Sequence, residues 1–371
     1  MIPLVDLKAQ YAAYKDELDD AIKEVIESAH FIHGPYCQKF ERDFASFCGG
    51  GSVALCGNGT DALYLSLREI LGQGNHRDEV ITVANTFIAT SETITMAGYH
   101  PVFVDINPDT YLIDPTNIEK AINERTRAIV PVHLYGQMAE MDWIMDIAKD
   151  HNLHVIEDAA QAHGATYRGR GPGQWGDAAC FSFYPGKNLG AWGDAGAIYS
   201  KDRSLTEKIK MRANHGRVEK YIHQFEGINS RLDEIQAAVL WVKLKHLNSW
   251  NEKRRMLATQ YSNLFSREKT VVIPYVNPQC SHVYYVYVIQ IPDRDRVIKG
   301  LQKRGIDAGV HYPVPLHHQP AYTSLKNFDY SLPITEKIAD RILSLPLYPE
   351  LKEADVQMIA DTVVDELRRG I

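Results

Sequence analysis

Apolar residues recur at helical spacing over residues 8–29, with acidic side chains between them. This spacing predicts an amphipathic helix near the N-terminus. Gly34 and Pro35 interrupt the pattern, because neither residue favours a helix interior. A second helix is expected from near Tyr36 to the glycines at 49–51.

Short apolar runs then alternate with segments of helical spacing as far as residue 157. The expected strands are 52–56, 79–83, 101–105, 126–134 and 153–157, and the expected helices are 63–71, 117–123 and 143–149. Strands that are apolar throughout are typical of a parallel sheet that is buried on both faces. The alternation therefore predicts an α/β fold with a mostly parallel sheet between two layers of helices.

The pattern continues with longer helical segments and then changes after about residue 265. A strand is expected at 178–183 and helices at 203–212 and 232–264, followed by strands at 283–291 and 306–311 and helices at 293–304 and 353–368. We therefore expect a large domain over residues 1–250 and a smaller C-terminal α/β domain over residues 251–371.

Composition excludes several classes of protein. The formal net charge of the 371 residues is −7, and no block of basic residues indicates a nucleic-acid partner. The first residues lack the pattern of a signal peptide, and no apolar run approaches the roughly 20 residues that span a bilayer. The five cysteines are scattered and lack a CxxC pair. We expect a cytoplasmic protein with reduced, packed thiols and no membrane partner.

Lys187 stands in a glycine-rich bend directly after the apolar run 178–183. Pro185 and Gly186 end the strand, and the residues that follow the lysine are small. This arrangement indicates an amine delivered into a crowded pocket. A solvated surface lysine is the ordinary alternative. A nucleotide P-loop is excluded, because Asn188 stands where that motif needs Ser or Thr.

Gly57, Gly59 and Ala62 match the relaxed dinucleotide fingerprint between an expected strand and an expected helix. A dinucleotide site would also need an acid after the next strand, and residues 84–89 contain none. The backbone N–H groups at the start of the helix still suit a phosphate. A tight turn with a purely structural role remains the alternative.

Asp158 follows the apolar strand 153–157, at the end of a parallel strand where such sheets bind ligands. The alternative is a helix N-cap. A second glycine pattern, from Gly171 to Gly176, also matches GxGxxG. It precedes a strand and contains a proline, and we interpret it as a loop.

A group of hydrogen-bonding side chains is expected beyond the strand at 306–311. It consists of His311, Tyr312, His317 and His318. These residues could form a metal site, but no acid or cysteine stands at ligand spacing. We therefore expect no metal there, and expect polar side chains held by prolines at the mouth of a cleft.

A buried lysine, an acid at a strand end and a phosphate site together match the needs of a pyridoxal-phosphate enzyme. The lysine binds the cofactor aldehyde, and the acid pairs with the pyridinium nitrogen so that the ring accepts electrons. Phe87 is available to cover the ring.

Eight ordered motifs resemble those of the DegT/DnrJ/EryC1/StrS family of sugar-nucleotide aminotransferases. They are 57–63 (GNGTDAL), 85–90 (NTFIAT), 130–137 (VPVHLYGQ), 157–161 (EDAAQ), 182–187 (SFYPGK), 193–197 (GDAGA), 227–233 (GINSRLD) and 310–317 (VHYPVPLH). The resemblance implies the aspartate-aminotransferase architecture, called fold type I, and a homodimer with shared active sites.

The resemblance also implies roles for single residues. Lys187 would be the Schiff-base lysine and Asp158 the partner of the pyridinium nitrogen. The other cofactor contacts would be Gly59 and Thr60 and the Ser182 hydroxyl at the phosphate, Gln161 near the ring hydroxyl, Phe87 on the ring, and Asn229 from the other subunit. Residues facing the sugar would be Arg231, His311, Tyr312 and His317. Some relatives carry histidine in place of the lysine and act as dehydratases, and this chain keeps Lys187.

The expected reaction moves an amino group from L-glutamate to C3 of a nucleotide-linked keto-sugar, in amino-sugar biosynthesis for surface polysaccharide or lipid A. Residues 59–61 resemble members that use UDP-linked N-acetyl sugars, which favours a UDP-3-keto-N-acetylhexosamine. The Pro185–Lys187 turn is shared with members that use a dTDP-3-keto-6-deoxyhexose. A 4-keto sugar aminotransferase, a binding protein without turnover and a nicotinamide dehydrogenase remain as further alternatives.

Overall fold

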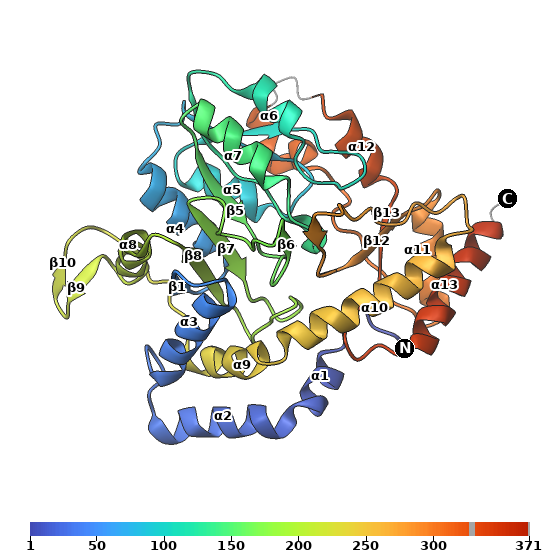
Figure 1. Cartoon of the computed structure of the whole chain (residues 1–371), viewed down its shortest axis with the longest axis horizontal. Coiled ribbons are helices and arrows are strands. Elements are labelled where there is room, and N and C mark those ends of the chain that lie inside the picture. Colours follow the sequence, from blue (N-terminus) through green and yellow to red (C-terminus); the bar gives the residue numbers. More distant parts are fainter. Residues whose placement is uncertain (326–330, 370–371) are drawn as a thin grey trace.

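The computed structural model describes residues 1–325 and 331–369. Its centre is a seven-stranded sheet with the order β1-β8-β7-β5-β4-β2-β3 (Figure 1). The strands are β1 (Ser52–Cys56), β2 (Glu79–Val83), β3 (His100–Val104), β4 (Thr126–Ile129), β5 (His154–Asp158), β7 (Ala178–Ser182) and β8 (Gly196–Ser200). Strand β8 runs antiparallel to both of its neighbours, and the other neighbouring pairs are parallel. The expected mostly parallel sheet is confirmed.

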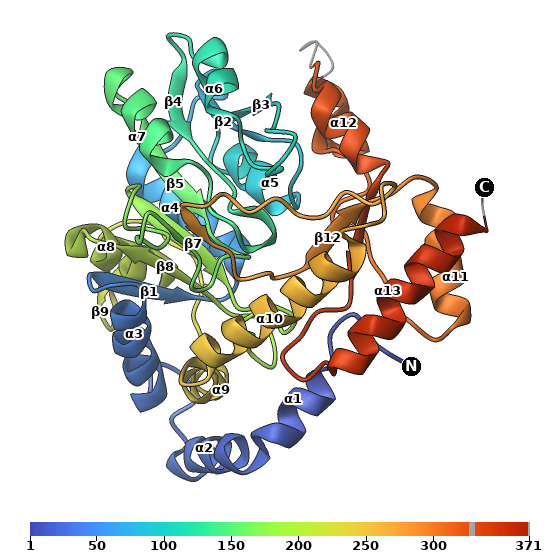
Figure 2. The same ribbon diagram turned by 45° about the vertical axis from the view of Figure 1, so that its right-hand side comes forward.

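Helices cover both faces of this sheet (Figures 1 and 2). The helices in the described part of the chain are α1 (Leu7–Ala13), α2 (Lys15–Ser28), α3 (Pro35–Phe47), α4 (Gly59–Leu71), α5 (Ala89–Met96), α6 (Pro115–Ala121), η1 (Leu134–Gly136), α7 (Met141–Asp150), α8 (Arg203–Ala213), α9 (Glu234–Leu244), α10 (Leu247–Phe265), α11 (Arg294–Lys303), η2 (Leu316–His318), η3 (Pro320–Leu325), α12 (Pro333–Ala339) and α13 (Glu353–Arg368). Of these, α11 and α13 pack on each other in the C-terminal part of the chain. Alternate residues of a strand point to opposite faces. Ile156 and Cys180 accordingly lie in one core cluster with residues of α4, α5 and α8. Val155 and Phe181 lie in another with residues of α3, α7 and α9.

Two helices that the spacing predicts as continuous are broken. The predicted helix over 8–29 is interrupted at Tyr14, whose backbone φ is −128°. The predicted helix over 232–264 is interrupted at Lys245 and His246, between α9 and α10. Helix α9 packs on α2 and α3, whereas α10 packs on α13. The chain has to change direction between these two sets of partners, and hydrophobic spacing does not reveal such a turn.

A second core lies in the C-terminal part of the chain, where β12 (Tyr287–Gln290) pairs with β13 (Ile342–Leu345). The strand expected at 306–311 is wrong. Ile306 and Gly309 form single bridges to two different segments, through Ile2 and Ser344, and no ladder develops. The remaining short strands are β6 (Thr166–Tyr167), β9 (Arg217–Glu219), β10 (Ile222–His223) and β11 (Cys280–Ser281).

Helix α10 joins the two cores. Its Leu247 belongs to the core under the sheet, whereas its Leu257 and Phe265 belong to the C-terminal core. The domain boundary expected between residues 250 and 251 falls inside this helix. We propose that the two domains meet along α10.

The described residues include no helix that is long and apolar enough to cross a membrane. The five cysteines are unpaired, and four of them are buried. The expectation of packed thiols is confirmed for these four.

Candidate active site

Lys187 follows β7 in a tight turn, in which its backbone N–H donates to the carbonyl of Tyr184 at 2.8 Å. The side-chain Nζ lies 4.3 Å from the centre of the Tyr285 ring. Burial is the main cause that lowers the pKa of this amine to about 8, and the negative charge of Asp158 opposes the shift. A lysine in these surroundings reaches its neutral, nucleophilic form close to physiological pH.

The neighbouring residue, Asn188, fixes the turn that carries the lysine. Its amide Nδ2 donates to Asn251 Oδ1 at 2.9 Å and to the carbonyl of Val283 at 3.0 Å. Asn251 in turn donates to the carbonyl of His163 at 2.9 Å. The sequence predicts the turn, but only the fold reveals that α10 and the segment around residue 283 hold it in place.

Asp158 is the last residue of β5 and is buried. Its Oδ2 accepts a hydrogen bond from Thr90 Oγ1 at 2.7 Å, and its Oδ1 accepts from the N–H of Ala160 at 3.1 Å. The N-cap alternative fails, because residues 159–164 form turns and no helix starts there. The carboxylate is thus held at the edge of the sheet, close enough to Lys187 to influence its charge.

Glu157, which precedes Asp158, fixes the end of the same strand from the opposite face. Its Oε2 lies 2.8 Å from His133 Nε2, and both side chains are fully buried. Its Oε1 accepts from the N–H groups of Gly173 and Gly176 at 2.9 and 2.8 Å. The second GxGxxG pattern is therefore a loop, as expected, and its backbone donors bind a carboxylate of the chain itself.

A cluster of polar and aromatic side chains lies beside Asp158. Gln161 Oε1 accepts from the N–H of Tyr135 at 2.7 Å, and its Nε2 donates to the Tyr312 hydroxyl at 3.2 Å. The Tyr312 ring lies 5.9 Å from the ring of Phe87, which is 54% exposed. The Tyr135 hydroxyl donates to the carbonyl of His311. Tyr135 was missed as a site residue, although it stands in the motif at 130–137.

His311 belongs to the same cluster of side chains, and its pKa depends on the positive charge of Lys187. Burial, reinforced by the positive charge of Lys187, lowers the pKa of His311 to about 4. Its Nδ1 lies 2.8 Å from Ser344 Oγ of β13. The imidazole is therefore neutral at physiological pH and links the C-terminal core to the site.

The N-terminus of α4 forms a cradle against the end of β7. A Cβ atom at Gly59 would lie 2.6 Å from Ser182 Cβ, and one at Gly196 would lie 2.3 Å from the carbonyl oxygen of Asn58. Glycine at both positions allows the helix start to approach the strand ends. The first N–H groups of a helix have no carbonyl partner within it, and they attract a phosphate.

These features fit pyridoxal phosphate. The cradle at Gly59, Thr60 and Ser182 suits the phosphate, and the buried carboxylate of Asp158 suits a protonated ring nitrogen. The amine of Lys187 suits a covalent bond to the aldehyde.

Three of the residues predicted from the sequence, Asn229, Arg231 and His317, lie outside the contacts described above around Lys187 and Asp158. Asn229 is exposed, and its backbone bridges to Asn214. Arg231 lines a cavity of about 400 Å³, and its Nε is buried without a hydrogen-bond partner in the described residues. His317 Nε2 lies 3.0 Å from Glu336 Oε1.

Comparisons with known proteins agree with this geometry. The model of the DegT/DnrJ/EryC1/StrS aminotransferase family matches residues 13–364. A crystal structure of S. venezuelae DesV superimposes with a TM-score of 0.95 at 43% identity, covering 98% of both chains.

Three curated relatives align over almost their whole length. The chain is 46% identical to a pleiotropic regulatory protein of Geobacillus stearothermophilus, covering 99% of each chain. It is 43% identical to a dTDP-3-amino-3,4,6-trideoxy-alpha-D-glucose transaminase of Streptomyces venezuelae, covering 98% of this chain and 95% of the relative. It is 41% identical to a UDP-N-acetyl-3-dehydro-alpha-D-glucosamine 3-aminotransferase of Acidithiobacillus ferrooxidans, covering 98% of this chain and 97% of the relative.

The matches confirm the expected fold type, enzyme class and cofactor. They span both cores, and they agree with the buried lysine, the strand-end carboxylate and the phosphate cradle. The chain belongs to the DegT/DnrJ/EryC1/StrS aminotransferase family and is a pyridoxal-phosphate-dependent aminotransferase.

Proposed function

We propose that this enzyme transfers an amino group from L-glutamate to C3 of a nucleotide-linked 3-keto sugar, and that UDP-3-keto-N-acetylhexosamine is the substrate. The observation that carries the proposal is the convergence of the Lys187 amine, the Asp158 carboxylate and the start of α4 at one edge of the sheet. The names of the relatives support amination at C3, because each transaminase above is named for a sugar whose C3 carries an amine or a ketone.

Bound pyridoxal phosphate supplies a ring that accepts electrons from the carbon atom beside the transferred amine. The Asp158 carboxylate, which Thr90 and Ala160 fix in place, would stabilise a proton on the ring nitrogen through its negative charge. Gly59, Thr60 and Ser182 would bind the phosphate, Gln161 would bind the ring hydroxyl, and Phe87 would cover the ring.

Lys187 has two tasks in this proposal. Its amine binds the cofactor between turnovers, and it carries a proton to and from the substrate carbon during transfer. Covalent bonding and proton removal need the neutral amine, whereas proton delivery needs the protonated amine. Burial lowers the pKa to about 8, which brings both forms within reach near physiological pH.

The side facing the sugar is built by His311 and Tyr312 at the cleft, together with residues of a second subunit. We propose a homodimer in which Asn229 and Arg231 reach the partner's Lys187. Two observations support it. The hairpin of β9 and β10 projects from the body of the chain (Figure 1), with Tyr221 82% and Ile222 55% exposed, and exposed apolar surface of this kind is typical of an interface. The Nε of the Arg231 guanidinium is also buried, and no residue in the described part of the chain accepts a hydrogen bond from it.

His317 remains a predicted substrate residue. The chain itself gives it another partner, Glu336, at 3.0 Å.

The proposal is tested by product analysis with L-glutamate and each 3-keto sugar nucleotide. The expected product carries a new amine at C3, identified by NMR, and one equivalent of 2-oxoglutarate. Lys187→Arg retains the positive charge but not the reactive amine, and turnover is expected to fall at least about 10²-fold. Turnover like that of the wild type in this variant would refute the role of Lys187. Cofactor that binds without any transfer from glutamate would support a binding protein instead.

A second candidate substrate is a dTDP-3-keto-6-deoxyhexose. The relative from Streptomyces venezuelae, named for a dTDP-linked 3-amino sugar, is 43% identical to this chain, slightly more than the 41% of the relative named for a UDP-linked sugar. The turn at 185–187 favours the dTDP substrate, whereas residues 59–61 favour the UDP substrate. We propose that the product enters surface polysaccharide or lipid A biosynthesis.

A further inference from the structure

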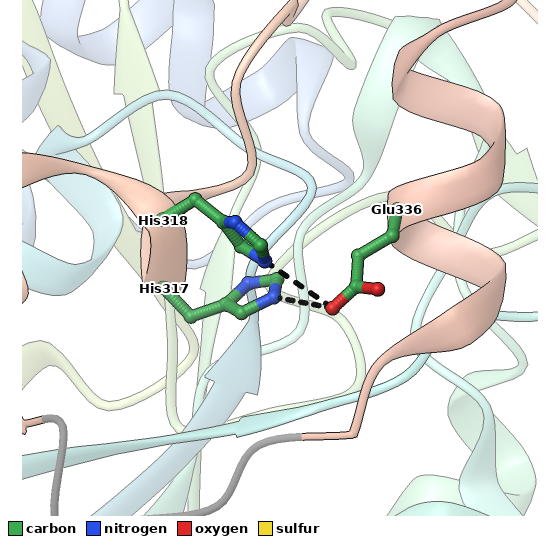
Figure 3. Close-up of side chains that lie close together, drawn as sticks. All are labelled: His317, His318 and Glu336. Carbon is green, nitrogen blue, oxygen red and sulfur yellow. Dashed lines mark hydrogen bonds and ion pairs between the residues drawn. The ribbon is translucent and has the colours of Figure 1, made fainter.

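A second polar cluster lies apart from the contacts around Lys187 and consists of His317, His318 and Glu336. Figure 3 shows the two imidazole rings of η2 turned toward the carboxylate of α12. Nε2 of His317 and Nε2 of His318 lie 3.0 and 3.2 Å from the same oxygen, Glu336 Oε1. One ligand atom from each residue lies within 4.8 Å of the others. In the sequence no acid stands at ligand spacing from the two histidines, and the fold supplies one from α12, 18 residues after His318.

The two elements that carry these side chains are tied to adjacent strands. The N–H of Leu316 in η2 donates to the carbonyl of Ala84, directly after β2, at 3.0 Å. Asp105, directly after β3, accepts from the N–H groups of Ile334 and Thr335 in α12, both at 2.9 Å. Strands β2 and β3 are parallel neighbours. The cluster is therefore held at the edge of the sheet. Side chains whose elements are already fixed lose less conformational freedom when they bind an ion.

Two of the three separations between the ligand atoms suit a tetrahedral ion, and one nitrogen of each imidazole lies within 4.8 Å of the other. Bonds of about 2.0–2.2 Å to nitrogen and carboxylate oxygen place tetrahedral ligands roughly 3.3 Å apart. The two nitrogen–oxygen separations of 3.0 and 3.2 Å are close to this value. Two imidazoles and one carboxylate with an open fourth position are a ligand set used by zinc, and imidazole also suits nickel and copper.

The cluster can be reached from the solvent, and the carboxylate of Glu336 favours a cation. The side chains of His318 and Glu336 are 52% and 43% exposed, whereas that of His317 is 5% exposed. One ligand is thus anchored inside the fold, and two can adjust at the surface.

We propose that His317, His318 and Glu336 form a binding site for a transition-metal dication of the zinc class. The ion joins η2 to α12 and so fixes the segment that follows His311 and Tyr312. Its role is to stabilise one wall of the cleft.

The test measures Zn²⁺ binding to the metal-stripped, full-length holoenzyme by titration calorimetry. His318→Gln and Glu336→Gln alter exposed side chains and are expected to remain folded. The matched control is His154→Gln, which removes another exposed histidine–carboxylate pair, 3.2 Å from Asp177. We expect one zinc ion per chain at this site, weakened at least about tenfold by each cluster variant and unchanged in the control.

A second measurement checks that the metal is coordinated directly. Co²⁺ at a site with two imidazoles gives visible absorption bands, and these are expected in the wild type and in His154→Gln but not in either cluster variant. The proposal is overturned if the wild type binds no Zn²⁺, or if both cluster variants bind it with the affinity and stoichiometry of the wild type.

Discussion

At the scale of single residues, the chemistry of Lys187 depends on its surroundings more than on its identity. Burial in the loop after β7 lowers the pKa of its amine to about 8, against an ordinary value near 10.4. The fraction of neutral amine therefore reaches one half near pH 8 and approaches its limit roughly one pH unit higher.

This shift gives a pH prediction. The rate at which cofactor-free enzyme binds pyridoxal phosphate covalently should be half-maximal near pH 8 and level off above it. With an unperturbed lysine the rate would be half-maximal only at about pH 10.4. The rate is measured by the growth of the cofactor absorption band after mixing, with Lys187→Arg as the control that should show no covalent band.

Thr90 is a positioning residue that the sequence did not single out. Its hydroxyl donates to Asp158 at 2.7 Å, and a hydrogen bond to a charged group contributes about 1.5–3 kcal/mol. Thr90→Val should slow the half-reaction with glutamate roughly tenfold or more, with unchanged folding. Thr90→Ser keeps the hydroxyl and should restore most of the rate. Equal rates in the two variants would contradict the positioning role.

Much of the site could be predicted at this scale. Lys187, Asp158 and the start of α4 each follow a recognisable local pattern, namely a glycine-rich bend, a strand end and a strand–glycine–helix junction. Thr90, Tyr135 and Asn188 could not be assigned roles in this way. Their partners lie 68, 26 and 63 residues away in the chain, and only the fold brings them together.

At the scale of elements, the end of β5 is held by the buried pair of Glu157 and His133. The N–H of Ala139 donates to His133 Nδ1 at 3.2 Å, and so the ring proton is on Nε2 and points to Glu157. Together with Gly173 and Gly176, three donors meet one carboxylate.

This arrangement predicts a graded loss of stability. Glu157→Ala leaves three donors without an acceptor, two of them buried and one partly buried. It should lower the free energy of unfolding by about 3 kcal/mol or more, since each unsatisfied group costs about 1–3 kcal/mol. Glu157→Gln keeps an acceptor for the glycines and should lose less. Urea unfolding curves measure both changes. A smaller loss for Ala than for Gln would contradict the account.

Element prediction succeeded where a segment keeps the same packing partners along its length and failed where a segment changes partners. Strands β1, β2, β5 and β7 and helix α13 lie close to the predicted bounds. The breaks at Tyr14 and at Lys245–His246, and the missing strand at 306–311, all occur where consecutive residues pack against different parts of the fold. Local spacing contains no information about that exchange of partners.

At the scale of the whole molecule, Asn229 and Arg231 lie outside the contacts around Asp158 in their own chain, which is the reason for the proposed shared site. A dimer with two-fold symmetry would bring both residues of each chain to the other chain's Lys187.

Mixing two inactive variants tests this arrangement. Lys187→Ala and Arg231→Ala are each expected to be inactive alone. After subunit exchange, half of the dimers are mixed and each contains one intact site, so that about a quarter of all sites should recover. Exchange is verified by native mass spectrometry with chains of different mass. No recovery after verified exchange would contradict shared sites.

The central claim is that the enzyme aminates C3 of a nucleotide-linked keto-sugar. The most direct measurement is a spectral titration of the amine-loaded, glutamate-treated enzyme with a panel of 3-keto and 4-keto sugar nucleotides carrying UDP or dTDP. The account predicts rapid return of the pyridoxal absorption band with a 3-keto sugar, first of all UDP-3-keto-N-acetylhexosamine. Rapid return with a 4-keto sugar, and none with either 3-keto sugar, would contradict it.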